Sequence, residues 1–280
     1  MIDFSTARAT IARLDKNSRK VSTPTGDGQM VWRVWGAGAP LVLVHGGHGS
    51  WTHWAKNIEA LAQTHTVIAA DVPGHGDSAM PHLPFTAESL ACDLAIGISA
   101  ILGTAPFKIM AFSFGTMLAG QVGVLLNAQV KKLLLVAPNG LKLRRGEQEE
   151  MTRWRELKDE AEILAAHRRN LGIQMIADPS RIDELSLYIH HENTRRTHLR
   201  ARWLARTDAL LVCLARIAAP IDCIWGGRDS TVGTYFDERK ALFAKERPDT
   251  VIEILPQGGH WVQYELADEF NPLALTLLQV

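Results

Sequence analysis

The chain has 280 residues, which is enough for one large α/β domain or two small ones. Hydrophobic residues make up 46% and charged residues 21%, the ordinary balance of a soluble globular protein. Thirty basic residues oppose thirty acidic ones, so no net charge would attract the protein to nucleic acid or to an anionic membrane.

The N-terminal residues and the cysteines of the chain bear on the cellular compartment in which we expect the protein. Residues 1–20 mix charges of both signs and have no apolar core of signal-peptide length. No window reaches the roughly eighteen apolar residues of a membrane span, so we expect a cytoplasmic protein without a membrane partner. Cys92, Cys213 and Cys223 lie in apolar stretches without metal-ligand spacing, and we expect them to be reduced core residues. The oligomeric state stays open.

The first elements are a helix, a hairpin and a buried strand. Residues 1–18 are expected to form a short amphipathic helix, an appendage before the domain proper. A glycine-containing turn at 25–28 separates two short runs, 20–23 and 30–35, and predicts an antiparallel hairpin. The continuous apolar run Leu41–Val44 is typical of a central parallel strand, because such a strand is covered on both faces.

The strand pattern then recurs along the chain, with helical stretches between the strands. Further strands are expected over residues 66–70, 107–112, 132–136, 221–225 and 251–255. Helices are expected over residues 51–63, 87–102, 115–127, 235–247 and 261–278. This alternation predicts a doubly wound, mostly parallel sheet with helices on both faces.

One segment breaks the alternation. From about residue 141 to residue 207 there is no convincing strand, only charged helical sequence over 144–170 and 182–205. An all-helical insertion is best placed over the carboxyl ends of the strands, the edge at which open α/β sheets bind ligands. We therefore predict a core of residues 1–140 and 208–280 with a helical cap of residues 141–207.

The strongest chemical motif is Ala111-Phe112-Ser113-Phe114-Gly115, directly after one expected strand and before a helix. A turn this sharp strains its central residue and needs small residues two positions before and after it, which Ala111 and Gly115 supply. It exposes the Ser113 hydroxyl at a helix N-terminus, where amide dipoles favour developing negative charge. The alternative is a serine that merely caps the helix.

A glycine-rich turn, residues 45–49, follows the strand Leu41–Val44. One of its backbone N–H groups can point toward Ser113 and form, together with the N–H of Phe114, a two-donor oxyanion hole. We favour Gly47 as this donor over His48. The glycines are also compatible with a simple tight turn.

Two further residues complete a candidate triad. Among eleven histidines, His260 alone follows a late strand in a glycine-rich loop, where a general base can reach the serine hydroxyl. Asp229 follows the strand 221–225 and supplies the carboxylate that orients the imidazole. Its rival Asp222 starts that strand, at the wrong end of the sheet, and is interpreted as a solvated turn residue.

The order of these motifs resembles the α/β-hydrolase superfamily, over the chain from about residue 20 to its end. The resemblance implies the α/β-hydrolase fold, with Ser113 as nucleophile, Asp229 as acid and His260 as base. The glycine-punctuated turn at 71–78, which we interpret as structural, is part of it. The matching motifs are residues 45–47, 71–78, 111–115, 226–229 and 258–260.

More narrowly, the chain looks like the branch with carbon–carbon bond hydrolases, haloperoxidase-like esterases, lactonases and epoxide hydrolases. The motif at the nucleophile begins with Ala111 where the family commonly has glycine, a change that the turn tolerates. Ser113 stands where haloalkane dehalogenases and epoxide hydrolases need an aspartate, which argues against those two activities.

Three functions fit this reading. The first is hydrolysis of an ester, lactone or thioester of a small molecule through an acyl-serine intermediate. The second is hydrolytic carbon–carbon cleavage of a dienoic keto acid, whose carboxylate would need a basic group from the cap. The third is a small-molecule receptor on a hydrolase scaffold.

No phosphate-binding loop or metal-ligand pair is apparent, so we expect no cofactor and no metal. Candidate pocket residues are His48, Arg195, Arg196, Trp203 and Trp261.

Overall fold

The computed structural model describes residues 3–199 and 201–279, and eight strands in this part of the chain form one sheet. The strands are β1 (Arg19–Thr25), β2 (Gly28–Trp35), β3 (Ala39–Val44), β4 (His65–Ala70), β5 (Phe107–Phe112), β6 (Val130–Val136), β7 (Ile221–Gly226) and β8 (Ile252–Leu255). Their order across the sheet is β1-β2-β4-β3-β5-β6-β7-β8. The hairpin β1–β2 and the pair β2–β4 are antiparallel, and the remaining pairs are parallel. Every expected strand is present within two residues of its predicted ends.

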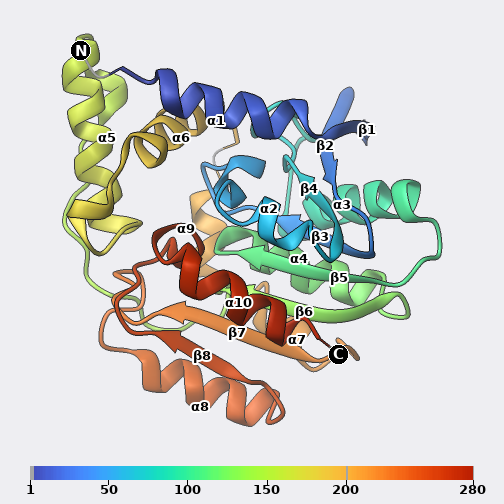
Figure 1. Cartoon of the computed structure of the whole chain (residues 1–280). Coiled ribbons are helices and arrows are strands. Elements are labelled where there is room, and N and C mark those ends of the chain that lie inside the picture. Colours follow the sequence, from blue (N-terminus) through green and yellow to red (C-terminus); the bar gives the residue numbers. More distant parts are fainter. Residues whose placement is uncertain (1–2, 200, 280) are drawn as a thin grey trace.

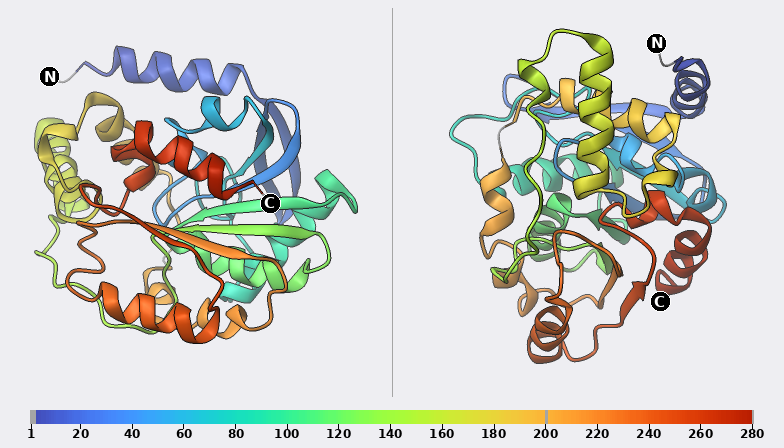
Figure 2. Two further views of the ribbon diagram at one scale, coloured as in Figure 1. Left: turned by 60° about the horizontal axis from the view of Figure 1, so that its bottom comes forward. Right: turned by 90° about the vertical axis from the view of Figure 1, so that its left-hand side faces the viewer.

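Helices cover both faces of the sheet, so the predicted doubly wound class is confirmed (Figure 1; Figure 2). α3, α4 and α8 cover one face, whereas α2 and α10 lie on the other, with α1 beyond them. The helices are α1 (Ser5–Lys16), α2 (Ile58–Leu61), α3 (Ala87–Leu102), α4 (Phe114–Leu125), α5 (Glu160–Gln174), α6 (Glu184–Arg195), α7 (Leu211–Leu214), α8 (Phe236–Glu246), α9 (Val262–Glu265) and α10 (Ala267–Leu277), with short 3₁₀ turns η1 (Trp51–Trp54), η2 (Trp154–Glu156), η3 (Pro179–Arg181) and η4 (Arg202–Arg206). None of the described helices is long and apolar enough to cross a membrane.

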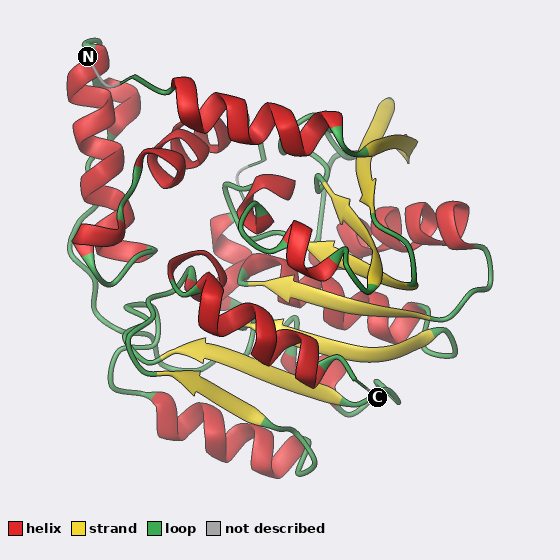
Figure 3. Ribbon diagram, viewed as in Figure 1, coloured by secondary structure: helices red, strands yellow, loops and turns green. Residues whose placement is uncertain are grey.

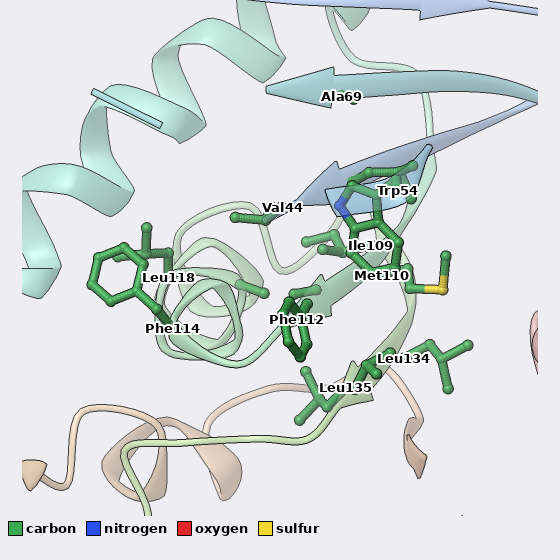
Figure 4. Packing of buried hydrophobic residues seen from close by; sticks show 14 of the residues in the cluster. Val44, Trp54, Ala69, Ile109, Met110, Phe112, Phe114, Leu118, Leu134 and Leu135 are labelled. Atoms are coloured by element: carbon green, nitrogen blue, oxygen red, sulfur yellow. The ribbon is translucent and has the colours of Figure 1, made fainter. Parts of the chain in front are cut away.

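The core lies between the central strands and the helices that cover them. Figure 4 shows Val44, Ile109 and Leu134 from the neighbouring strands β3, β5 and β6, together with Leu118 from α4 and Trp54 from η1. These side chains are almost completely buried. Because both faces of these strands are covered, their sequences are continuously apolar rather than alternating. This packing gives the sheet edge a rigid base.

Several helices are shorter than predicted because local capping decides where they begin and end. The expected helix 144–170 is realised as α5, which begins only after Asp159, whose side chain accepts the Glu162 N–H. The expected helix 182–205 is α6, which ends at Arg195. The expected C-terminal helix is divided at Leu266, and Arg181 donates to the carbonyl of Glu265 next to this break.

Two further expectations need correction. The helix predicted over residues 51–63 is divided into η1 and α2, and the short α7 was not predicted. Cys213 and Cys223 are buried free thiols as expected, but Cys92 is exposed, so its prediction as a core residue was wrong. The reason is that Cys92 lies on the outward side of α3, whose apolar content extends beyond its buried face.

The segment 141–207, predicted as a cap, lies at the carboxyl ends of the central strands. The arrowheads of β5 to β8 point to the side of the molecule on which α5 and α6 lie (Figure 3). Within the described residues of this segment there is no strand. α1 joins this segment to the sheet, because the Ala7 N–H donates to Glu184 of α6 and the Trp35 indole donates to the carbonyl of Leu14.

Candidate active site

The sharp turn between β5 and α4 presents the Ser113 hydroxyl. Ser113 has φ 50° and ψ −115°, a left-handed backbone conformation that side-chain-bearing residues rarely adopt. Such strain costs roughly 1–3 kcal/mol and persists only where the surroundings enforce it. Gly115 permits the close packing that surrounds this turn, because a Cβ at this position would lie 2.5 Å from the carbonyl oxygen of His45 and 2.6 Å from that of Val44.

The structure brings the three predicted triad residues together from three separate loops. His260 Nε2 lies 2.8 Å from Ser113 Oγ, and His260 Nδ1 lies 2.8 Å from Asp229 Oδ2. The second oxygen of Asp229 accepts the Thr231 N–H at 2.8 Å. Asp229 and His260 are both almost completely buried. These contacts hold the imidazole between the hydroxyl and the carboxylate.

Two residues that the sequence did not single out extend this arrangement on the other side of Ser113. Asn139, in the loop after β6, places its Nδ2 atom 2.9 Å from Ser113 Oγ. Arg145 donates to the Asn139 Oδ1 atom. Because a guanidinium can only donate, Asn139 must present its oxygen to Arg145 and its NH₂ group to Ser113. No motif marks Asn139; the signal is its position just after a parallel strand.

The directions of the four hydrogen bonds follow from this constraint. Since Asn139 donates to Ser113 Oγ, the Ser113 O–H is free to donate to His260 Nε2. His260 then carries its proton on Nδ1 and donates it to Asp229. All donors point from Arg145 toward Asp229, and the proton on Ser113 faces a neutral imidazole that can accept it.

The charge of Asp229 is favoured despite its burial. Burial alone would raise the pKa of this carboxyl group. The facing His260 imidazole and the hydrogen bonds from Thr231 outweigh that effect and lower the Asp229 pKa below its ordinary value of 3.8. The carboxylate is therefore ionised over the neutral pH range, and it stabilises positive charge that forms on the imidazole.

Buried histidines support the glycine-rich loop after β3. His45 donates from Nδ1 to the carbonyl of Gly46 at 2.7 Å and accepts the Val72 N–H at Nε2 at 2.9 Å. Burial lowers the pKa of His45 to about 4. The Gly46 N–H points to His53 Nδ1 at 3.3 Å. These contacts fix the loop to Val72 and His53. A Cβ built on Gly47 would lie 3.6 Å from the Cβ of Phe114.

The predicted pocket residues are distributed over several places. Arg195 is exposed and contacts His191, and Arg196 forms an ion pair with Asp77. Trp203 is half exposed, with its ring 6.4 Å from that of Phe85. That these three side chains line a pocket over the serine stays a prediction.

The other two candidates lie in the loops after β3 and β8. His48 is half-buried in the loop after β3 and has φ 51°. His190 of α6 acts electrostatically on His48, and burial lowers the pKa of His190 to about 3. Trp261 directly follows His260, but it is buried and donates to the carbonyl of His53, so it supports the loop from below.

Asp222, the rival of Asp229, has a different role from the one predicted. It is at the start of β7, far along the sheet from the nucleophile turn, as expected. It is not a solvated turn residue, however, because it is buried, pairs with Lys132 at 2.5 Å and accepts the Val251 N–H at 2.9 Å. Strand pairing brings Lys132 of β6 beside it, which sequence position alone does not reveal.

Among the described residues, no group of three or more His, Cys, Asp or Glu side chains is arranged to hold a metal ion.

The sequence model of the alpha/beta hydrolase family matches residues 41–273. The chain belongs to the α/β hydrolase family. This membership agrees with the fold and with the loop positions of Ser113, Asp229 and His260. The resemblance expected from the motif order is therefore confirmed.

Named relatives of this α/β hydrolase have several activities. It is 29% identical over 86% of its length to the dihydrolipoyllysine-residue acetyltransferase component of the acetoin cleaving system of Pseudomonas putida, and it spans 64% of that protein. It is 25% identical over 87% of its length, and 85% of the relative's, to the 2-hydroxy-6-oxo-6-(2'-aminophenyl)hexa-2,4-dienoic acid hydrolase of Metapseudomonas resinovorans.

Solved structures share the fold. A meta-cleavage product hydrolase from Pseudomonas fluorescens superimposes with a TM-score of 0.72 at 22% identity, covering 92% of this chain and 96% of that one. A bacterial membrane phospholipase A superimposes with a TM-score of 0.76 at 18% identity, covering 98% of this chain and 90% of that one. At these identities the likeness concerns the fold alone.

Proposed function

We propose that this α/β hydrolase cleaves an ester, lactone or thioester bond of a small molecule through an acyl-serine intermediate at Ser113. One observation carries the proposal. Ser113 Oγ, His260 and Asp229 are linked by two hydrogen bonds of 2.8 Å, in the order that a nucleophile, a general base and an orienting carboxylate require.

Acylation begins with attack of Ser113 Oγ on the substrate carbonyl. His260 Nε2 accepts the hydroxyl proton as the bond to carbon forms, and Asp229 stabilises the resulting imidazolium. The tetrahedral intermediate then collapses. The carbon bond to the leaving oxygen or sulfur breaks, His260 returns the proton to the leaving group, and the acyl group stays on Ser113.

The negative oxygen of that intermediate needs hydrogen-bond donors. We assign this role to the backbone N–H groups of Gly47 and Phe114. Phe114 begins α4, so its N–H has no acceptor within the helix, and a Cβ built on Gly47 would lie 3.6 Å from the Cβ of Phe114. Loss of one such donor typically costs about 3–4 kcal/mol of transition-state stabilisation.

Deacylation uses the same residues. With the leaving group gone, His260 accepts a proton from a water molecule, and the oxygen of that water attacks the acyl carbon. The second tetrahedral intermediate breaks its bond to Ser113 Oγ, which takes the proton back from His260. The products are an acid and a restored Ser113 hydroxyl.

The test is an assay of wild type and Ser113→Ala against aryl esters of graded acyl length, together with a lactone. We expect turnover by the wild type and a loss of at least about a thousandfold in kcat/KM for Ser113→Ala. Ser180→Ala is the matched control, because Ser180 is exposed in the turn η3, and it should behave as wild type. Equal rates for wild type and Ser113→Ala would refute the role of Ser113.

Carbon–carbon bond hydrolysis is the second candidate. The observation that favours it is the 25% identity, over most of both chains, to the dienoic acid hydrolase of Metapseudomonas resinovorans. A dienoic keto acid belongs in the same assay, and a kcat/KM for it above that for every ester would assign the second activity instead. Binding without turnover of any substrate would favour the receptor function.

A further inference from the structure

A pocket of about 280 Å³ is lined by the loop after β6. Asn139 belongs both to this pocket and to the active site, because it lines the pocket and donates to Ser113 Oγ. Four cationic side chains are among the lining residues, and no carboxylate is: Lys142, Arg145, Arg206 and Arg239.

The arginines of this pocket are not neutralised by ion pairs. Among the described residues, Arg144 pairs with Glu238, whereas Arg145, Arg206 and Arg239 have no carboxylate partner within 4.0 Å. Arg239 is buried and donates to two backbone carbonyls, and Arg145 donates to Asn139. Neutral acceptors thus hold the guanidinium groups of Arg145 and Arg239 in place, and neither group is paired with a carboxylate.

Burial without an ion pair disfavours the charged form of two of these arginines. Burial lowers the pKa of Arg145 and of Arg239. Asp229 acts favourably on both of them and Glu238 on Arg239, but the oxygens of Asp229 already accept from His260 and Thr231, and Glu238 pairs with Arg144. A guanidinium stays charged even so, which leaves a positive pocket beside the nucleophile.

The loop that carries part of this pocket is held in an unusual conformation. Ala137, Gly140 and Lys142 all have positive φ, of 46°, 75° and 54°. Strained backbone of this kind persists where surrounding structure enforces it, and it concentrates at ligand sites. Ala137 and Lys142 carry this strain, whereas Gly140 adopts positive φ without steric cost.

We propose that this pocket binds an oxyanion, a carboxylate or a phosphate, carried by the substrate whose scissile carbonyl is attacked by Ser113. The proposal rests on the proposed function and adds a substrate class to it. Arg145, with its neighbours Arg206 and Arg239, supplies the planar N–H donors that recognise carboxylate and phosphate groups in two-point contacts.

The sheet order fixes where the anion lies relative to the reacting bond. β5, which carries Ser113, lies between β3 and β6. The Gly47 loop follows β3 and the pocket loop follows β6, so the two flank the nucleophile on opposite sides. A substrate therefore places its carbonyl oxygen toward Gly47 and its anionic group toward Arg145. The Asn139 side chain lies between these two groups of the substrate.

The test compares three aryl esters with acyl chains of equal length that end in a methyl group, a carboxylate or a phosphate monoester. We expect wild type to prefer one of the charged esters, and the better one identifies the anion. Arg145→Gln and Arg206→Gln should each lower the charged-to-neutral ratio of kcat/KM by about tenfold to a hundredfold. Arg206→Gln removes a positive charge from the pocket but keeps the hydrogen bond that Arg145 donates to Asn139. It therefore separates the effect of charge from an effect on the orientation of Asn139. Arg144→Gln is the matched control outside the pocket, and its ratio should equal that of wild type.

A binding measurement keeps this proposal distinct from the proposed function. Intact charged and neutral esters are titrated into Ser113→Ala by calorimetry, where no hydrolysis interferes. Tighter binding of the charged ester that is lost in Ser113→Ala/Arg145→Gln supports the pocket even if wild type turns nothing over. Equal affinity for charged and neutral esters, or a ratio unaffected by Arg145→Gln and Arg206→Gln, overturns it, whether or not the esters are hydrolysed.

Discussion

The side chain of Asn139 donates a hydrogen bond of 2.9 Å to Ser113 Oγ, and its orientation is set by Arg145 on the other side of the amide. Ser113 therefore accepts one hydrogen bond and donates another, to His260. The nucleophile is held from two sides, by a residue of the β6 loop and by the loop after β8. This relationship leads to a graded prediction for Asn139.

We expect Asn139→Ala to lower kcat/KM about tenfold, because one lone pair of Ser113 Oγ loses its donor. Asn139→Asp should lower it by about a hundredfold or more. A carboxylate there pairs with Arg145 and accepts the Ser113 proton, which diverts the hydroxyl from His260. Steady-state kinetics on one aryl ester give the order. An Asn139→Asp enzyme as active as Asn139→Ala would contradict the assigned hydrogen-bond directions.

The strained backbone of Ser113 predicts a stability difference between two inactive variants. Ser113→Gly should be more stable to unfolding than Ser113→Ala by about 1 kcal/mol, because glycine adopts positive φ without steric cost whereas alanine keeps the strain. Urea unfolding of both proteins measures the difference. The same pair at Ser180, an exposed residue, should show no advantage for glycine. If Ser113→Gly is the less stable protein, the turn is not strained.

The loops that carry Asp229 and His260 are in backbone contact at Gly226. A Cβ at Gly226 would lie 2.1 Å from the carbonyl oxygen of Gly259. Gly226→Ala must therefore push the two loops apart, and we expect kcat/KM to fall about a hundredfold, as for a misplacement of about 1 Å. Gly47→Ala is the comparison, because a Cβ there makes an ordinary contact of 3.6 Å. It should retain the fold and most activity. Equal activity of both variants would exclude this coupling.

The hydrogen bonds of His45 predict a dependence of stability on pH. Both ring nitrogens are matched to the neutral form, and burial lowers the pKa from 6.5 to about 4. As the pH falls below 6.5 the unfolded chain binds a proton that the folded protein rejects. The free energy of unfolding should therefore fall down to about pH 4, by up to about 1.4 kcal/mol per pH unit.

His45→Gln removes this titrating group while keeping an acceptor for the Val72 N–H. We expect the variant to be less stable than wild type at pH 7 but to lose less stability between pH 7 and pH 4.5. Urea unfolding at several pH values measures both quantities. His82→Gln, a change at an exposed histidine, should follow the wild-type curve. A His45→Gln protein with the wild-type pH dependence would show that His45 does not cause the loss.

Local sequence was sufficient for the strands and for the nucleophile turn. Continuous apolar runs such as Leu41–Val44 identify strands buried on both faces, since the pattern depends only on neighbouring residues. The motif around Ser113 and the late glycine-rich loop of His260 are likewise contiguous. The rule that ligands gather at the carboxyl ends of parallel strands then placed Asp229 with them, and the hydrogen bonds of the folded chain agree.

Tertiary structure alone decided which side chains line the pocket that includes Asn139. Arg145, Arg206 and Arg239 lie in different segments and meet only because the β6 loop, the η4 turn and α8 converge at one edge of the sheet. Arg195 and Arg196 have the same chemistry in the sequence, but folding directs them to His191 and Asp77. The position of a charged residue in the sequence follows no periodic pattern that predicts which residue its side chain will contact in the folded protein. The sequence therefore determined the scaffold and the loops that carry Ser113, Asp229 and His260, and long-range packing decided the pocket.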